Sequence, residues 1–284
     1  MKKTLKVILS LACVIALVAS LGAGALAYTD AEIDQIAMDA QRALDIQAVE
    51  NIMNRHVMYH CYGEHIEEME EIWVQDPVNQ ATASFGQNQG FYVGYGSIWD
   101  AYMTGHDQSW LKSAKSYCEK NGIDVSDWTD EQILEVYGGV GQLLLHVTTT
   151  AIIEVAEDGK TAQGTWYSIG ADCYPEEGGA ADTNWNCQKI CADFIKEPGG
   201  WKIWHVVFSN DFMVQTGHDV GELQSIYIRG TGRDEIDFGD PTIPMLAHDP
   251  SYTWCDNYPP LNDPYETFTD EISYGPEGHP NYNG

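Results

Sequence analysis

The sequence predicts an α+β fold, a cone-shaped curved antiparallel sheet wrapped around N-terminal helices. The first observation is the stretch 143–173, which reads as two long strands joined at Asp158-Gly159. Its first arm is rich in Val, Thr and Ile, which favour a pleated, half-buried surface, and Asp-Gly is typical of a tight hairpin turn. The second observation is the order of elements: helix, short helix, hairpin, helix, then long strands.

The first 27 residues predict a signal peptide rather than part of the fold. Three lysines precede an apolar run at 7–21, and Ala25-Leu26-Ala27 offers a small-residue cleavage site. No later stretch approaches the roughly 20 apolar residues that a membrane-spanning helix needs. We therefore expect a protein secreted or held on the exterior of the cell envelope, with no membrane association after leader removal.

The net charge and the number of cysteines agree with an exported protein. The chain has 43 acidic and 14 basic residues, a formal charge of −29, which disfavours nucleic acid as a partner. An even number of cysteines after the leader predicts disulfides in an exported protein, and a bridge between Cys173 and Cys187 would close the base of a Gly-rich loop. The six are Cys61, Cys118, Cys173, Cys187, Cys191 and Cys255.

Two helices are expected to open the mature chain. Thr29 and Glu32 form a capping-box pattern, and apolar residues then recur at helical spacing as far as Val57. Gly63 interrupts the run, a second short helix follows over 66–73, and Asp76-Pro77 is expected to end it.

The remaining elements are a hairpin, a helix, an insertion, four strands and an arm. Residues 28–216 form the predicted domain, interrupted by a polar helical insertion at 105–141. Residues 217–284 are acidic and rich in Pro and aromatic residues, which predicts an extended arm lying on the domain. The expected short strands are 81–85 and 90–93, the helix lies within 95–103, and the long strands are 146–155, 161–173, 188–196 and 201–212.

Three stretches carry a resemblance to the SnoaL-like branch of the nuclear transport factor 2-like superfamily. They are DIQAVENIMNRHVMYHCYGEHIEEMEEIW, LLHVTTTAIIEVAEDGKTAQGTWYS and DFIKEPGGWKIWHVVFSNDF, spanning roughly residues 45–213. Similar proteins include polyketide cyclases, scytalone dehydratase and bile-acid dehydratase. The resemblance implies an apolar pocket lined by Tyr, His and Asp that works without metal or organic cofactor. His146 falls on the family's strand histidine, whereas Tyr62 and Val57 hold the positions of its helix Asp and Tyr.

The candidate catalytic residues are His146, Tyr59, Tyr62 and Asp172. An imidazole both accepts and returns a proton near neutral pH, and strand alternation predicts that His146 shares a face with Thr148, Thr150 and Ile152. Tyr59 and Tyr62 are i,i+3 on the first helix, where a phenol can polarise a substrate oxygen. The plainer interpretations are a hydrogen-bonded strand histidine, packed aromatic rings and a solvated strand-end acid.

Candidate substrate-binding residues are His60, Trp166, Trp99 and Phe85, for which core packing is the alternative. His56, His60 and Glu64 are spaced i, i+4, i+8 and would form a metal face on an unbroken helix. Gly63 argues against an unbroken helix there, so no metal is predicted.

The sequence thus predicts an exported, cofactor-independent lyase or isomerase, dehydratase-like, acting on a small hydroxylated cyclic or aromatic molecule. The alternative is a non-catalytic module that binds a hydrophobic ligand or forms a homodimer. No Walker loop, dinucleotide fingerprint, G-x-S-x-G or HExxH motif is present.

Overall fold

The computed structural model describes residues 28–87, 90–175, 181–216, 243–244 and 259–278. The predicted leader, Cys255 and most of the region 217–258 lie outside these residues. The chain divides into two compact units, Met1–Ala43 and Leu44–Gly284. Over the described residues, no helix combines the length and apolarity that a membrane crossing requires.

The first helix, α2 (Asp30–Tyr62), begins as predicted. The Thr29 side chain accepts a hydrogen bond from the Glu32 amide, and Glu32 accepts from the Thr29 amide, which completes the capping box. Gly63 then takes φ 71°, the left-handed conformation that ends many helices, and α3 (His65–Glu71) follows.

Asp76-Pro77 begins a helix instead of only ending one. Asp76 caps α4 (Pro77–Thr82) by accepting a hydrogen bond from the Val78 amide. Proline at the first helical position is favoured because its missing N–H is not needed there. The prediction took Pro77 as a stop signal and missed this helix.

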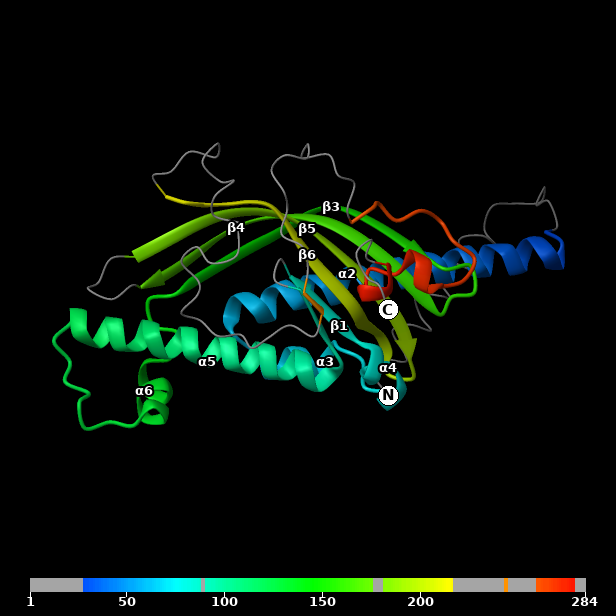
Figure 1. Cartoon of the computed structure of the whole chain (residues 1–284). Helices are drawn as coiled ribbons and strands as arrows, with labels where there is room; N and C mark the ends of the chain where they lie inside the picture. The colour runs from blue at the N-terminus through cyan, green and yellow to red at the C-terminus, as the bar shows by residue number, and fades with distance from the viewer. Residues whose placement is uncertain (1–27, 88–89, 176–180, 217–242, 245–258, 279–284) are drawn as a thin grey trace, which may run out of the picture. The chain divides into compact units, whose positions relative to one another are not determined.

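The sheet confirms the predicted fold class (Figure 1). In the described residues its strand order is β3-β4-β5-β6-β1-β2-β7, and every neighbouring pair is antiparallel except β1 with β6, which is parallel. The strands are β1 (Ser84–Gln87), β2 (Gly90–Val93), β3 (Leu143–Val155), β4 (Thr161–Pro175), β5 (Ala181–Glu197), β6 (Gly200–Gln215) and β7 (Ile243–Pro244).

The inner face of the sheet holds the main hydrophobic core. Side chains of α2, α3 and α5 pack there against β4, β5 and β6, with Met53, Trp73, Ile98, Ile190 and Phe194 almost completely buried. Burying such side chains is worth roughly 1.5–3 kcal/mol each. The buried carboxylate of Asp45 on α2 accepts hydrogen bonds from Lys196 and from the Trp201 indole, which fixes α2 to the sheet.

One helix is much longer than predicted. α5 (Tyr95–Lys120) runs without a break from the expected short helix into the insertion, and α6 (Asp130–Tyr137) completes it. Gly105 was taken as a boundary, but a single glycine costs a helix only about 1 kcal/mol. α6 starts at a capping box formed by Thr129 and Gln132.

A β-bulge corrects the predicted face of β3. Thr150 has φ 54°, and the register with β4 shifts by one residue between Thr149 and Ile152. One extra residue reverses the alternation of side chains beyond it. His146 and Thr148 therefore share their face with Ile153 and not with Ile152.

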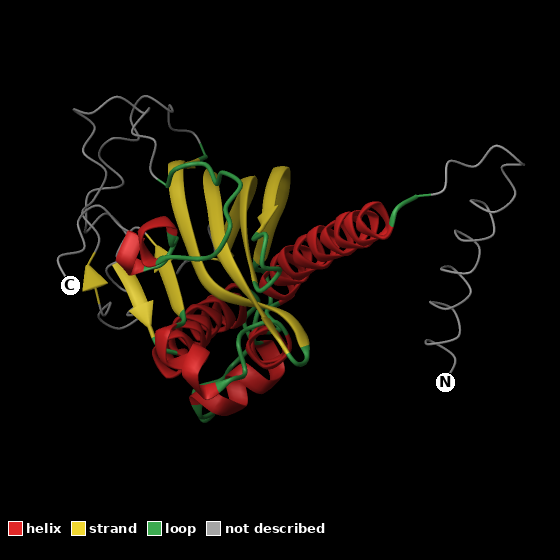
Figure 2. Cartoon of the chain, turned by 90° about the vertical axis from the view of Figure 1, so that its right-hand side faces the viewer, coloured by secondary structure: helices red, strands yellow, loops and turns green. Residues whose placement is uncertain are grey.

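The C-terminal arm lies against the outer face of the sheet in its described part, 259–278 (Figure 2). It contains two short turns, η2 (Asp270–Ile272) and η3 (Pro276–Gly278). Tyr274 is buried against Phe91, Cys191 and Val207, and the side chain of Asn262 donates hydrogen bonds to two sheet carbonyls. The predicted docking of the arm is confirmed for this segment.

The predicted bridge between Cys173 and Cys187 is wrong. The β4–β5 register pairs Cys187 with Ile169 and Cys173 with Thr183, so the two cysteines are offset by four residues, about 13 Å along the strands. A disulfide needs Cα atoms within about 7 Å. Cys173 contacts the Thr183 hydroxyl instead, and Cys61, Cys118 and Cys191 are also free thiols.

Candidate active site

A histidine–aspartate pair lies on the inner face of the sheet, opposite α2. His146 on β3 and Asp172 on β4 have Nε2 and Oδ1 3.3 Å apart, and their side chains are only 11% and 8% exposed. The pairing of His146 with Gly170 brings the aspartate two residues further along β4 to the same face. Asn186 on β5 donates a hydrogen bond to the other carboxylate oxygen of Asp172.

Gly170 forms the base of this site. A Cβ atom at this position would lie 2.8 Å from Nδ1 of His146 and 2.9 Å from Oδ1 of Asn186. It would also meet the Leu145 carbonyl oxygen at 2.3 Å. Any larger residue would therefore displace the backbone of β3 or the polar atoms of His146 and Asn186.

Several buried polar atoms of the interior have no hydrogen-bond partner among the described residues. On the sheet they are His146 Nδ1, Ser168 Oγ and Asn186 Oδ1, and on the helices His60 Nδ1 and Tyr102 Oη. Native proteins pair the large majority of such atoms, and a catalytic role or a bound water or ion explains many exceptions.

The helices contribute a second buried histidine–carboxylate group. Glu68 of α3 is completely buried, and its Oε1 lies 2.7 Å from Nδ1 of His56 and accepts a hydrogen bond from the Trp73 indole. Its Oε2 lies 3.3 Å from Nδ1 of His65. Burial by itself would raise the pKa of Glu68, but the charge and hydrogen bonds of these histidines lower it strongly, so the carboxylate is ionised.

His60 connects the two groups. Its ring centroid lies 5.5 Å from that of His146 and 5.1 Å from that of His65. Burial, followed by the neighbouring His65 and His146, lowers the pKa of His60 well below its usual value, so its imidazole is neutral at pH 7. Burial and the Glu68 carboxylate raise the pKa of the Tyr102 phenol far above 10, so it stays protonated.

Three of the predicted site residues come together here: His146, Asp172 and His60. Phe85 packs edge-on against Tyr102, with ring centroids 4.9 Å apart, and the ring of Tyr102 lies 5.3 Å from that of His65. Trp166 and Trp99 belong to the hydrophobic core instead. Trp166 covers Gly164 and packs against Phe194, and Trp99 stacks on Tyr95.

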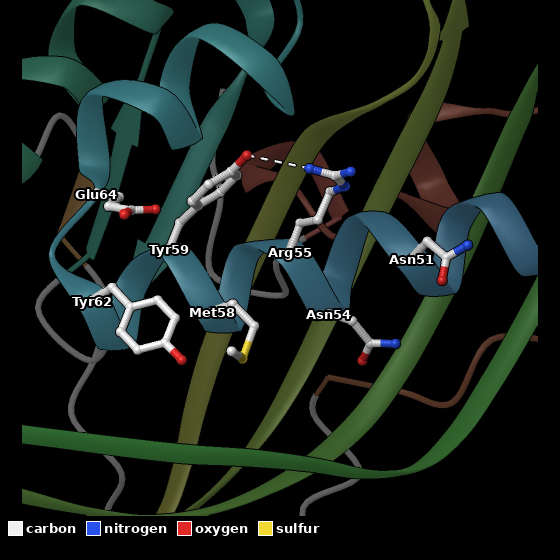
Figure 3. Close-up of a pocket in the computed structure, with 7 residues that line it drawn as sticks. All are labelled: Asn51, Asn54, Arg55, Met58, Tyr59, Tyr62 and Glu64. Carbon is white, nitrogen blue, oxygen red and sulfur yellow. Dashed lines mark hydrogen bonds between the residues drawn. The ribbon is translucent and has the colours of Figure 1, made fainter.

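Tyr59 and Tyr62 do not face His146 across the interior. Both line an open pocket of about 540 Å³ along α2 (Figure 3), and Asn54, another residue of this pocket, accepts a hydrogen bond from the Thr148 hydroxyl of β3. Tyr62 is 64% exposed. The hydroxyl of Tyr59 accepts a hydrogen bond from Arg55 and donates one to Glu71, which raises its pKa. The pocket is completed by Asn51, Asn54, Met58 and Glu64.

Sequence reasoning missed Tyr102, His65, Glu68 and Asn186. His65 and Glu68 carry a usable signal, an i,i+3 pair on a short helix just after a helix-ending glycine. Tyr102 lies inside the helix expected within 95–103, but no residue pattern distinguished it from the other aromatic residues there. Asn186 depends on the β4–β5 register, which residue spacing does not reveal.

The fold and this site define a curved-sheet α+β protein with a buried, histidine-rich interior. Residues 41–207 match the model of the SnoaL-like domain, and the chain belongs to this family. No curated protein matches the sequence.

Solved structures show remote likeness. A hexachlorocyclohexane dehydrochlorinase, LinA-type3 from Novosphingobium barchaimii, has 12% identity over 64% of this chain and 96% of its own, with a TM-score of 0.42. An NTF2-like protein with a cystatin-like fold from Novosphingobium aromaticivorans has 13% identity over 70% of this chain and 96% of its own, with a TM-score of 0.38.

Proposed function

We propose that the chain is an exported, cofactor-independent lyase or isomerase whose base is His146. The observation that carries the proposal is the pair of His146 and Asp172 together with the buried atoms His146 Nδ1 and Asn186 Oδ1, which have no hydrogen-bond partner within the described residues and lie beside Gly170. Such atoms cost roughly 1–3 kcal/mol each when left unpaired. A polar substrate that enters this space would satisfy them.

The geometry supports one proton-transfer sequence. The Asp172 carboxylate lies 3.3 Å from Nε2 of His146; in the proposed sequence it favours a proton on that nitrogen, and the lone pair of Nδ1 is the base. Nδ1 takes a proton from a carbon next to a carbonyl group, and Asp172 stabilises the resulting imidazolium. His146 then gives the proton to a hydroxyl on the neighbouring carbon, which leaves as water while the C=C bond forms.

The surrounding residues fit a cyclic or aromatic substrate with oxygen substituents. The rings of Phe85 and Phe208 lie beside the polar group, with centroids 5.6 Å apart, and Phe208 also contacts His56. An interior with little water strengthens electrostatic interactions with such a substrate.

Export remains part of the proposal. It rests on the leader-like residues 1–27, which lie outside the described residues, and on the strongly acidic composition.

The test is a mass-spectrometric screen of the purified protein against hydroxylated cyclic ketones and polyketide-like aromatics. We expect loss of water, or an isomer detected by chromatography, with the wild type. His146→Gln should slow the reaction by about 10²–10⁴-fold, the usual contribution of a general base. Unchanged turnover in His146→Gln contradicts the proposal.

Two further variants test the site and its control. Gly170→Ala places a methyl between His146 and Asn186 and against the Leu145 carbonyl oxygen, so both stability and activity should fall. His205→Gln is a matched control, because His205 is also a buried strand histidine beside an aspartate, but on the opposite face. It should lose stability and keep the turnover of its folded fraction.

A second candidate function, homodimerisation, is favoured by an apolar patch on the outer face of β3, β4 and β5. Its side chains are 41–56% exposed and adjacent in register, as in Val147 opposite Ile169. Contiguous exposed apolar surface is typical of association sites. The patch comprises Leu143, Leu145, Val147, Tyr167, Ile169 and Trp185.

The proposed partner is a second copy of this chain. Light scattering should give a dimer for the wild type and a monomer for Ile169→Lys, with Leu261→Lys, an exposed leucine of the arm, as a control. A monomeric wild type at micromolar concentration contradicts this second candidate.

A further inference from the structure

Three side chains at the junction of α2 and α3 form a compact group of potential metal ligands. His60, His65 and Glu68 each direct one ligand atom to within 4.8 Å of the others. His65 and Glu68 are buried, and Nδ1 of His60 is a buried atom with no hydrogen-bond partner among the described residues. The sequence did not predict these three residues as one metal site.

The local sequence explains how they meet. His60 lies in the last turn of α2, and Gly63 at φ 71° turns the chain so that α3 folds back beside it. His65 and Glu68 are i,i+3 on α3 and so lie on one face of that helix. Gly63 ends α2, so His56, His60 and Glu64 do not share one helical face. The same chain reversal brings His65 and Glu68 close to His60.

The distances suit a small tetrahedral ion. Nδ1 of His65 and Oε2 of Glu68 are 3.3 Å apart, close to the edge of roughly 3.4 Å in a tetrahedron with Zn²⁺–ligand bonds of about 2.0–2.1 Å. The third ligand atom lies within 4.8 Å of these two, so it must move closer for all three to reach one ion.

The carboxylate is already held as a metal ligand would be. Oε1 of Glu68 is occupied by His56 at 2.7 Å and by the Trp73 indole at 3.4 Å, which leaves Oε2 directed toward His65. Hydrogen bonds of this kind orient ligands in metal sites and tune their affinity. Two imidazoles and one carboxylate are a donor set that suits zinc and its neighbours rather than Mg²⁺ or Ca²⁺.

We propose that His60, His65 and Glu68 bind one divalent transition-metal ion of the Zn²⁺ type, with His56 as the residue that positions Glu68. Three protein ligands leave a further position for water or for a substrate oxygen. The ring centroids of His60 and His146 are 5.5 Å apart, so the ion would lie near the proposed base. The steps of the proposed reaction use no metal, and the binding of the ion does not depend on them.

The experiment uses the purified chain after dialysis against a chelator. Titration with zinc chloride in a calorimeter should show one ion bound per chain, and magnesium chloride should show none. Cobalt chloride should give the intense visible absorption of a tetrahedral ion. Elemental analysis of the zinc-loaded protein after gel filtration checks the stoichiometry.

Four variants make the assignment specific. Glu68→Gln and His60→Gln should each weaken zinc binding by more than about 100-fold, and His56→Gln by about 10–100-fold, the usual effect of an orienting residue. Glu64→Gln, an exposed carboxylate at the same helix junction, should leave the affinity within about 2-fold of the wild type.

Folding is checked separately, because Glu68 is completely buried. His60→Gln is the decisive variant, since it removes a nitrogen that has no partner in the described structure; circular dichroism should show that it is folded.

The proposal is overturned if the folded wild type takes up no zinc saturably. It is equally overturned if His60→Gln and Glu68→Gln both bind zinc as the wild type does. Failure here leaves the dependence of turnover on His146 untouched. Conversely, zinc binding together with normal turnover of His146→Gln refutes the proposed function alone.

Discussion

The two faces of the sheet each carry a buried histidine–aspartate pair, and the two pairs differ in how completely they are hydrogen-bonded. On the outer face, His205 and Asp193 lie 2.8 Å apart, and both side chains are at most 3% exposed. On the inner face, His146 and Asp172 lie 3.3 Å apart and are slightly more exposed. Both pairs have the same sequence pattern, a strand histidine and a nearby aspartate, so the pattern alone cannot tell which pair is structural and which belongs to a site.

The outer pair is saturated with partners. Asp193 accepts hydrogen bonds from Gln163, from the Ser273 hydroxyl and from the Tyr274 amide, besides its contact with His205. Ser273 approaches the same ring nitrogen of His205 that faces Asp193, so the three do not form a nucleophile–base–acid relay. This network fixes the C-terminal arm to the sheet.

The inner pair has polar neighbours whose atoms stay unpartnered within the described residues. Complete hydrogen bonding is what a structural network needs, whereas a site for a ligand keeps donors and acceptors available. A structural histidine–aspartate pair is therefore distinguished from a functional one by the hydrogen bonding of the polar atoms around it. The identity of the two residues is the same in both cases.

The largest expected effect concerns the two aspartates. Asp193→Asn should lower the free energy of unfolding by about 3 kcal/mol or more, because it breaks a buried ion pair and a network of four donors. Asp172→Asn should cost only about 1–2 kcal/mol but slow the proposed reaction. Denaturant unfolding and turnover measure the two effects. If both aspartate variants lost the same free energy of unfolding, the two histidine–aspartate pairs would not differ in their structural role.

The next effect is the pH dependence of stability on the outer face. Burial raises the pKa of the Cys191 thiol to about 12, whereas an unfolded thiol ionises near 9. The unfolded state therefore binds fewer protons above pH 9, and the contribution of Cys191 to stability, complete below pH 9, is lost between about 9 and 12. The slope is about 1.4 kcal/mol per pH unit for one proton.

Denaturant unfolding between pH 8 and 11 should show a flatter profile for Cys191→Ala than for the wild type. Cys61→Ala is the matched variant on the inner side, where half-burial raises the thiol pKa less, and it should change the profile less. Parallel profiles for the wild type and Cys191→Ala would show that the outer face is not closed over this thiol.

The smallest expected effect compares two buried tyrosines. Tyr274→Phe removes a hydroxyl that donates to the Pro260 carbonyl at 2.8 Å, so it should cost about 1 kcal/mol. Tyr102→Phe removes a hydroxyl without a partner of good geometry in the described structure, so stability should be unchanged or slightly higher. Thermal unfolding checks both, and a clear loss in Tyr102→Phe would mean that its hydroxyl is structural.

Much of the fold could be predicted because the relevant signals are local. The capping box at Thr29, the break at Gly63 and the Asp158-Gly159 turn each depend on a few neighbouring residues and on backbone sterics. The same locality explains the errors. The prediction missed the helix at Pro77 and the continuation of the long helix beyond Met103. In each case a single residue can start, end or be tolerated in a helix, and the surrounding packing decides which of these occurs.

The sequence by itself determined the helix boundaries at Thr29 and Gly63, the strand that carries His146, and the family. Only the tertiary structure decided which polar groups meet: that Asp172 and not Tyr62 faces His146, and that His60 joins His65 and Glu68. The physical reason is that register, a β-bulge and the direction of a chain reversal set these distances. Such features arise from contacts between residues far apart in sequence, and no spacing within one element encodes them.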